Sequence, residues 1–294
     1  MSVSAAQVKE LRERTGAPMM ECKKALMATE GNMEDAILEL RKRGRAGADK
    51  KAGRVAAEGI IVVRSNEAGA VMVELNSETD FVARDENFVT LAGLIAETLL
   101  ASPEVQDVTA PGSLTLLNGE TVEAARQALV AKVGENIHVR RMSRIAAPLS
   151  RTGIYLHGSR IGVLVELDCD NPDLAKDIAM HIAASRPMVI TPEEVSADVI
   201  TREREIFLAE AATSGKPEAI MEKMVEGRIR KFLCEVSLQG QPFVRDPGQT
   251  VGTLLSQQHA KVLRFVRFEV GEGIEKVTED FVGAVMAQAG MGDK

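Results

Sequence analysis

The stretch GIIVVRSNEAGAVMVEL, residues 59 to 75, decides how the rest of the chain is interpreted. It contains two apolar runs, at 60–63 and 70–75, separated by the turn-forming sequence Ser-Asn-Glu-Ala-Gly. Two extended runs on either side of a short turn predict a β-hairpin. The periodicity therefore changes from helical to extended at this point of the chain.

A related order of elements returns near the middle of the chain. The stretch GIYLHGSRIGVLVELDCD, residues 153 to 170, predicts a second hairpin from Ile154 to Leu167. Each hairpin ends on Val-Glu-Leu and precedes a predicted helix, and both helices close on Ala-Ser shortly before a proline. We interpret this as an internal duplication of a hairpin-plus-helix unit, with a chance match of short strings as the alternative.

Between the two copies the chain predicts one further helix and one further strand. TVEAARQALVAKV, residues 121 to 133, has a helical pattern that stops at Gly134, and IHVRRMSRI, residues 137 to 145, alternates as a strand does. Together with the hairpins, these segments predict an α+β core of mostly antiparallel sheet with helices packed on it.

The first 44 residues predict three short helices. Ser4 with Gln7 forms a capping-box pattern, Gly16 and Gly31 are plausible helix ends, and Asn32 can cap a third helix that stops before Gly44. The result is a miniature three-helix bundle. The linker that follows is rich in Gly, Ala and basic residues, so it is either a flexible tether or a partly helical connector.

Two long charged helices are predicted from Asp198 to Ala212 and from Pro217 to Phe232, with a Ser-Gly-Lys-Pro turn between them. Their narrow apolar stripes favour an antiparallel helical hairpin that projects as a two-stranded coiled coil. A hairpin that lies along its own core is the alternative. The stretch 262–273 then resembles a strand, and a final helix is expected from about Asp280.

These segments divide the chain into six expected parts. They are a three-helix N-terminal domain (1–44), a linker (45–58), a first core subdomain (59–150), a second core subdomain (151–196 and 234–273), a coiled-coil hairpin insertion (197–233) and a C-terminal module (274–294).

Composition excludes several classes of function. The 294 residues are 45 % hydrophobic, which suffices for an ordinary core, and the net charge of −7 makes direct nucleic-acid binding a poor expectation. Three cysteines, far apart and not in a C-x-x-C pair, argue against a disulfide framework and a zinc site. No apolar signal core and no stretch long enough to span a membrane is found, so we expect a cytoplasmic protein.

Catalytic and nucleotide-binding motifs are also missing from the sequence. It contains no P-loop, no G-x-G-x-x-G, no H-E-x-x-H and no G-x-S-x-G, and its four histidines are scattered singly. We therefore expect a binding or regulatory protein, with no enzyme activity, metal or cofactor.

One loop raises a specific question about function. NSETDFVARDENF, residues 76 to 88, places Phe81 beside Asp80 among other acidic side chains, between a predicted strand and a predicted helix. Phe81 either folds back under its own hairpin or is presented to a partner.

Seven strings spread along the chain indicate a family. They are VKELRERTGAPMMECKKAL (8–26), TDFVARDENF (79–88), YLHGSRIGVLV (155–165), AMHIAASRP (179–187), VEGRIRKF (225–232), GQPFV (240–244) and FEVGEGIEK (268–276). In this order they closely resemble bacterial elongation factor Ts. The resemblance implies a guanine-nucleotide exchange factor without covalent chemistry. Its partner would be the translational GTPase elongation factor Tu, in both the GDP-bound and the nucleotide-free form.

The resemblance also implies an architecture and a set of contact residues. The family has a ubiquitin-associated-like N-terminal bundle, a duplicated core, a coiled-coil insertion and a C-terminal helix. Its T-D-F-V motif, which inserts beside the partner's magnesium and phosphate site, matches Thr79, Asp80, Phe81 and Val82. Further partner contacts match Arg12, Met19, Met20, Lys23, His157, Gly158 and Val244, and Arg245 stands where the family can have an apolar Met.

Three of these matches have support from the residues alone. Met19 and Met20 are adjacent and cannot both face so small a core, which predicts an exposed adaptable patch. Gly158 beside His157 permits a close approach of backbones.

The rival to the exchange function is a coiled-coil scaffold that would use 198–232 and leave Asp80 and Phe81 without a role.

Overall fold

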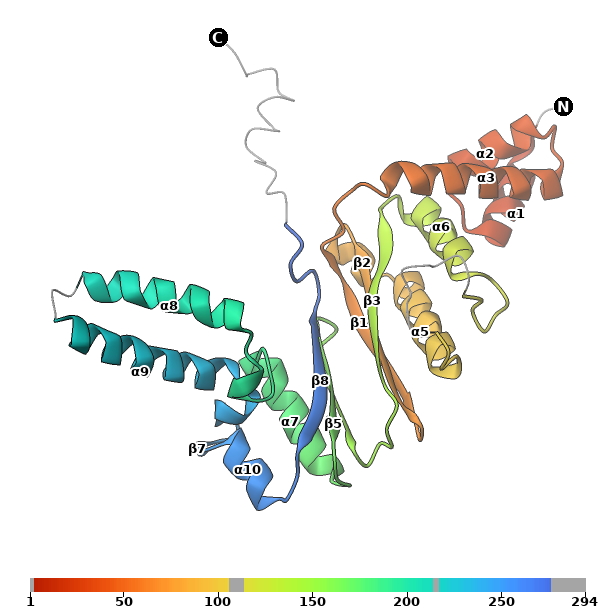
Figure 1. Ribbon diagram of the computed structural model, residues 1–294. Helices are drawn as coiled ribbons and strands as arrows, with labels where there is room; N and C mark the ends of the chain where they lie inside the picture. Colours follow the sequence, from red (N-terminus) through yellow and green to blue (C-terminus); the bar gives the residue numbers. More distant parts are fainter. Residues whose placement is uncertain (1–2, 106–113, 214–216, 276–294) are drawn as a thin grey trace, which may run out of the picture.

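The computed structural model describes residues 3–105, 114–213 and 217–275. It shows a mixed α+β fold in which N-terminal helices precede small antiparallel sheets with interspersed helices (Figure 1). The helices are α1 (Ala5–Thr15), α2 (Met19–Ala28), α3 (Met33–Lys51), α4 (Asp80–Ala83), α5 (Glu86–Ala101), α6 (Val122–Val133), α7 (Pro172–Ser185), α8 (Ala197–Ala212), α9 (Glu218–Val236) and α10 (Val251–Gln257), with short 3-10 turns η2 (Pro192–Glu194) and η3 (Leu238–Gly240). The strands are β1 (Glu58–Asn66), β2 (Gly69–Ser77), β3 (Ile137–Ile145), β4 (Thr152–His157), β5 (Ile161–Leu167), β6 (Pro242–Phe243), β7 (Asp246–Thr250) and β8 (Val262–Glu269).

Two three-stranded antiparallel sheets lie face to face at the centre of the molecule. Their strand orders are β1-β2-β3 and β4-β5-β8, and β6 pairs with β7 in a separate small ribbon. Side chains from both sheets fill the space between them, among them Ile61, Met72, Ile145, Leu164 and Phe268. Helices cover the two outer faces, α5 and α6 on the first sheet and α7 on the second (Figure 1).

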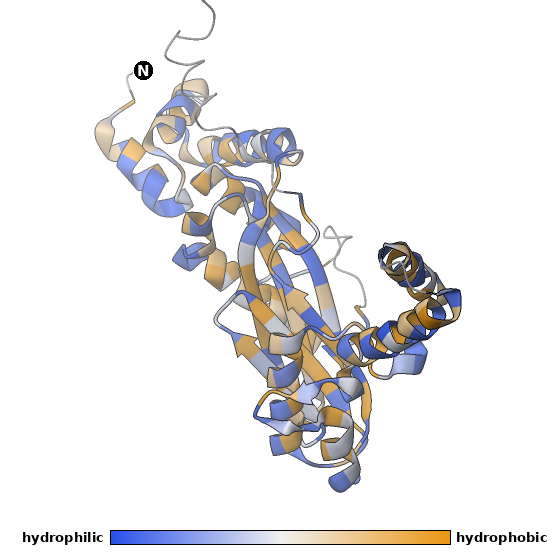
Figure 2. Ribbon diagram, turned by 90° about the vertical axis from the view of Figure 1, so that its left-hand side faces the viewer, coloured by the Kyte–Doolittle hydropathy of each residue, from blue (hydrophilic) through white to orange (hydrophobic). Residues whose placement is uncertain are grey.

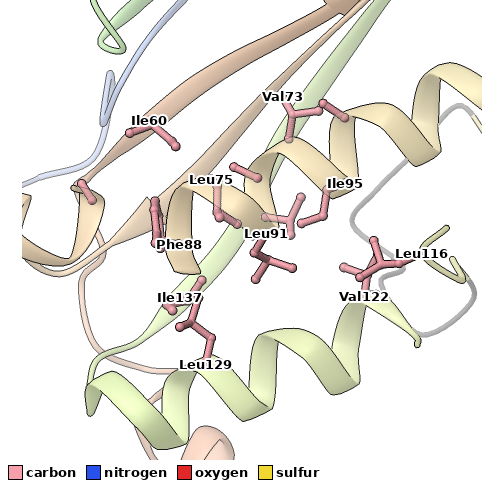
Figure 3. Packing of buried hydrophobic residues seen from close by; sticks show 14 of the residues in the cluster. Ile60, Val73, Leu75, Phe88, Leu91, Ile95, Leu116, Val122, Leu129 and Ile137 are labelled. Atoms are coloured by element: carbon pink, nitrogen blue, oxygen red, sulfur yellow. The ribbon is translucent and has the colours of Figure 1, made fainter. Parts of the chain in front are cut away.

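The alternation of β-strand side chains explains this layering. Ile60 packs toward the helices while its neighbour Ile61 packs toward the second sheet, because successive side chains of a strand point to opposite faces. Figure 3 shows the outer side of this arrangement, where Val73 and Leu75 meet the apolar face of α5 around Ile95. Both faces of the first sheet are thus buried, which is why its hairpin is continuously apolar.

The middle strand of each sheet, β2 or β5, has a shift of its pairing register within its Val-Glu-Leu sequence. The register of β2 against β3 shifts between Glu74 and Leu75, and that of β5 against β8 shifts between Glu166 and Leu167. These are the Val-Glu-Leu ends at which the two hairpins match. Each shift leaves one unpaired residue on the neighbouring strand, as a β-bulge does.

The N-terminal helices form where the caps predict them. Ser4 and Gln7 make the reciprocal capping-box bonds, Gly16 ends α1 in the left-handed conformation, and Asn32 caps α3. A small apolar cluster around Leu11 and Leu26 holds the three helices together.

The expected end of the third helix at Gly44 is wrong, because α3 continues to Lys51. A Cβ added at Gly44 would lie only 3.4 Å from the Cβ of Ala131, a residue of α6. This distance leaves room for a methyl group but little for a larger side chain, so the role of Gly44 is in packing and not in termination. Of the two alternatives for the linker, the structure shows the helical connector over residues 45–51.

Helices α8 and α9 lie antiparallel and extend away from the sheets (Figures 1 and 2). They share a small cluster in which Ala211, Val225 and Ile229 are buried, while Ile220 on α9 is 47 % exposed. The geometry agrees with a projecting hairpin and not with one lying along the core. The turn at residues 214–216 lies outside the described residues.

The segment between α9 and β8, for which the sequence predicts no elements, contains η3, β6, β7 and α10. Its apolar residues complete the core under α7, with Leu238 and Val251 fully buried. The expected C-terminal helix lies outside the described residues. Within the part of the chain that the structure describes, no helix combines the length and the apolar character needed to cross a membrane.

Candidate partner-binding site

The residues expected as an irregular loop at 79–82 form one helical turn, α4. The Thr79 side chain caps it by accepting a hydrogen bond from Val82 N at 3.4 Å. Val82 and Ala83 are buried beneath the turn, whereas Phe81 points outward with 81 % of its surface exposed. The alternative in which Phe81 folds back under its hairpin is therefore wrong.

The acidic neighbours of Phe81 have different roles. Asp85 caps α5 with hydrogen bonds from Asn87 N and Phe88 N, and the Asn87 side chain is the main cause that lowers the pKa of Asp85 below its ordinary value. Asp80 contacts Arg84 at 2.9 Å on the surface, an exposed pair of little energetic weight. The Asp80 side chain is 47 % exposed and is thus accessible to a partner.

The turn at the β4–β5 hairpin carries two other expected contact residues, His157 and Gly158. Both are exposed, and Gly158 has a positive φ of 57°. The turn rests on the start of β1, because Ile61 N donates to Ser159 O at 2.7 Å and Arg160 contacts Glu58 at 2.7 Å.

This contact brings the His157 turn and α4 to the same end of the two sheets. Glu58 pairs across the sheet with Ser77, and the Ser77 hydroxyl donates to Thr79 O at 2.9 Å. Two exposed side chains, Phe81 on α4 and His157 at the end of β4, are thereby presented by neighbouring segments.

Val244 lies in the turn between β6 and β7 and is 43 % exposed. Its backbone N–H donates to Nδ1 of His181 at 3.2 Å, and Nε2 of His181 lies 3.0 Å from Oε1 of Gln241. One neutral tautomer, with the proton on Nε2, satisfies both contacts, and burial lowers the pKa of His181, partly offset by Gln241. Arg245 forms an ion pair with Asp177 on α7, so it stabilises the turn instead of providing an apolar contact.

The remaining expected contact residues lie on the N-terminal helices. Arg12 and Lys23 are exposed, and so are Met19 and Met20, at 47 % and 61 %. The predicted exposure of the two methionines is confirmed. Helices α1 and α2 and the strand β7 lie at opposite ends of the molecule (Figure 1). The expected site residues therefore form separate patches along the molecule and not one pocket.

Sequence reasoning missed two residues that hold these patches in place. Glu135 accepts two hydrogen bonds from Thr79, and His181 supports the turn of Val244. Glu135 is 56 residues away from Thr79 in sequence, so no local pattern predicts the contact. His181 lies on the apolar face of α7, so its burial can be predicted from the helical period. Its contact with the backbone of Val244 cannot be predicted in this way.

The fold and these surfaces define the class of protein. Among the residues that the structure describes, no group of three or more His, Cys, Asp or Glu side chains is placed to hold a metal ion. The exposed side chains are aromatic, aliphatic and basic, spread over turns and helix ends. This is the arrangement of a protein that binds a macromolecular partner over a large surface.

Comparison with known proteins gives the family. The family model described as "Elongation factor TS" matches residues 78–272. Elongation factor Ts of Legionella pneumophila (strain Paris) is 57 % identical over 291 residues, 98 % of each chain. Elongation factor Ts of Thioalkalivibrio sulfidiphilus is 58 % identical over 292 residues, 98 % of this chain and 99 % of the relative. That of Idiomarina loihiensis is 53 % identical over 294 residues, the whole of both chains. The chain belongs to the elongation factor Ts family.

Proposed function

We propose that this chain promotes GDP release from elongation factor Tu by inserting the turn of Asp80 and Phe81 beside the GTPase's Mg²⁺ and phosphate site. Family membership makes the chain the nucleotide exchange factor of elongation factor Tu in translation elongation, a protein without covalent chemistry. Translation elongation in bacteria takes place in the cytoplasm, where the chain and its partner meet.

The observation that carries this proposal is the exposure of Phe81. A side chain with 81 % of its surface in water gains nothing from folding, and here it stands on a turn whose neighbours Val82 and Ala83 are buried. A rigid aromatic ring is suited to insertion into a partner, since it buries a large apolar area and fixes few rotatable bonds.

Asp80 adds charge to the same turn. A carboxylate is a preferred ligand of Mg²⁺ and repels phosphate oxygens, so its arrival near the nucleotide disturbs the groups that hold the ion. Because Mg²⁺ neutralises the phosphates of the bound nucleotide, its displacement loosens GDP.

The other exposed patches supply the binding energy for this insertion. Arg12, Met19, Met20 and Lys23 would contact the GTPase from one end of the molecule, His157 and Gly158 from the middle, and Val244 from the other end. By thermodynamic linkage, bound GDP lowers the affinity of the factor for elongation factor Tu by the same ratio as the factor lowers the affinity of GDP. Each tenfold loosening of GDP needs about 1.4 kcal/mol of differential contact energy, so several patches must act together.

The finer architecture belongs to the same proposal. The matching bulges at Glu74/Leu75 and Glu166/Leu167, and a helix after each hairpin, support a duplicated core with subdomains 59–150 and 151–196 plus 234–273. Residues 1–44 would be a ubiquitin-associated-like bundle, 197–233 a coiled-coil insertion, and 274–294 a C-terminal module. The packing of α3 on α6 supports an extension of this N-terminal unit to Lys51, the end of α3.

The test is the release of fluorescent GDP from elongation factor Tu, measured by stopped flow with the wild type and with Phe81→Ala. We expect the variant to keep its unfolding temperature, because the ring is exposed, and to slow exchange on the order of tenfold or more. Leu117→Ala, which removes another exposed apolar side chain (62 %), is the matched control and should exchange normally. Wild-type exchange by Phe81→Ala would show that the ring is not the inserted group.

A further inference from the structure

The carboxylate of Glu135 is the closest support of the exposed turn. Glu135 follows Gly134, which ends α6 in the left-handed conformation with φ 82°. Its Oε2 accepts from Thr79 N at 3.0 Å, and its Oε1 accepts from Thr79 Oγ1 at 2.7 Å. The same Oγ1 caps α4 through Val82 N. The Glu135 carboxylate thus accepts hydrogen bonds from both donors of Thr79, the residue that caps α4.

The neighbouring Asn136 fixes the other side of the same backbone segment. Asn136 N donates to Oε1 of Glu78 at 2.6 Å, and its buried amide donates to Arg54 O at 2.8 Å and Ala52 O at 3.3 Å. The turn between α6 and β3 therefore contacts residues 78 and 79 together with the connector from the N-terminal bundle. It holds Glu135 in a defined position beside Thr79.

A turn as short as α4 needs such support. Four residues cannot maintain a helix by themselves, because nucleation costs more than a single turn returns. Phe81 is exposed and Asp80 has only a surface partner, so neither contributes packing that would fix its own direction. The direction of Phe81 is therefore set by Val82 beneath the turn and by the hydrogen bonds of Thr79.

We propose that Glu135 is a positioning residue for nucleotide exchange, which keeps Asp80 and Phe81 in the orientation that enters the GTPase. This rests on the proposed role of Phe81 and extends it to a residue that does not itself reach the nucleotide. Loss of the carboxylate leaves the turn in several orientations, and exchange slows in proportion to the fraction that is still competent.

The first measurement tests positioning without using exchange activity. The chain contains no Trp, so Phe81→Trp introduces a single fluorophore at the exposed position. In this background Glu135→Ala should lower the steady-state anisotropy of the introduced indole, and Glu135→Gln, which keeps one acceptor oxygen, should lower it less. Glu67→Ala removes an exposed carboxylate from the β1–β2 turn and should leave it unchanged. An anisotropy that Glu135→Ala does not alter would overturn the proposal.

The second measurement is a double-mutant cycle on exchange with elongation factor Tu, using Glu135→Ala, Phe81→Ala and the double variant. The maximal exchange rate of Glu135→Ala should fall roughly three- to tenfold, as expected for two lost charge-assisted bonds at a partly exposed site. Its half-saturating concentration should change little, because the other patches are intact. In the Phe81→Ala background the same substitution should have a clearly smaller effect, because only Asp80 then remains to be positioned.

The outcomes separate the two proposals. If Phe81→Ala slows exchange but the effect of Glu135→Ala is simply additive, Glu135 does not act through the turn and only the present inference is overturned. If Phe81→Ala exchanges at the wild-type rate, the proposed function of the turn fails, and the exchange role of Glu135 fails with it. If Glu135→Ala does not fold, Glu135→Gln replaces it in the anisotropy measurement and in the double-mutant cycle, and the same outcomes support or overturn the proposal.

Discussion

At the scale of single residues, the most demanding position is Glu74. Its side chain is fully buried at the end of the inter-sheet space, yet it is saturated with donors. Arg141 Nε lies 2.5 Å from one oxygen, and Arg140 Nη1 and Gly271 N lie 3.0 Å and 2.9 Å from the other. Burial alone would raise the pKa of Glu74, but the Gly271 N–H and the two guanidinium groups outweigh it and lower the pKa.

Glu74→Gln should therefore lower stability by an amount that depends on pH. Removing one partner of a buried ion pair leaves the Arg140 guanidinium without this anion and Arg141 with only the more exposed carboxylate of Glu272, so we expect a loss of about 2 kcal/mol or more at pH 7. Since the pKa of Glu74 is lower in the folded than in the unfolded state, the ionised carboxylate stabilises the fold fully above the unfolded pKa. That contribution disappears as the pH falls through the folded pKa.

Urea unfolding of both proteins at a series of pH values checks this. The difference between wild type and Glu74→Gln should be constant between about pH 7 and 5.5 and shrink below about pH 4.5. Glu67→Gln in the exposed β1–β2 turn is the control and should match the wild type throughout. A difference that grows on acidification would contradict the assignment of Glu74 as a buried anion.

At the scale of elements, local patterns were sufficient wherever a cap or a period decided the outcome. The capping box at Ser4, the cap at Asn32 and the stop at Gly134 all lie where the sequence predicts helix ends. Gly44, like Gly134, follows a helical sequence pattern, but α3 continues through Gly44 whereas α6 ends at Gly134. The difference arises because Gly44 packs on α6, which is far away in sequence. The support of Thr79 by Glu135 escaped prediction for the same reason.

The packing of α3 on α6 gives a prediction with a control in the same helix. Gly44→Leu should separate the two helices, because even a Cβ at this position would lie 3.4 Å from the Cβ of Ala131. Gly47→Leu should not, since no atom lies within 4 Å of a Cβ placed there. Gly44→Ala should be tolerated, because a contact of this length is ordinary and Ala favours the helix by about 1 kcal/mol.

Limited trypsin digestion measures the separation, because residues 41–54 offer many Lys and Arg cleavage sites. We expect Gly44→Leu to be cut in this segment on the order of tenfold faster than the wild type, as local opening becomes easier. Mass spectrometry locates the cut. Equal protection of Gly44→Leu and Gly47→Leu would mean that α6 does not hold the connector.

At the scale of the whole molecule, the two packed sheets form the centre from which the binding patches and the α8–α9 hairpin extend. The hairpin has its own apolar cluster, separate from the core under α7. It is joined to the rest mainly at its base, where Met188 N donates to Val236 O at 2.8 Å and Leu238 N to Val189 O at 2.9 Å. Its removal should therefore leave the sheets, α4 and the β6–β7 turn in place.

This independence gives a test of whether the core patches or the coiled-coil hairpin provide the contacts that drive exchange. Residues 203–230 can be replaced by a four-residue Gly-Ser linker, because packed antiparallel helices lie about 8–10 Å apart and four extended residues span more than that. If exchange is driven by the core patches, the truncated chain should release fluorescent GDP from elongation factor Tu within about twofold of the wild-type rate, since distant sites contribute independently. Phe81→Ala in the truncated chain should slow release as much as it does in the full chain. A truncated chain that has lost exchange while it retains its unfolding temperature would assign the decisive contacts to the hairpin. Release near the wild-type rate and still sensitive to Phe81→Ala would place them at the end of the two sheets, where Phe81 stands exposed.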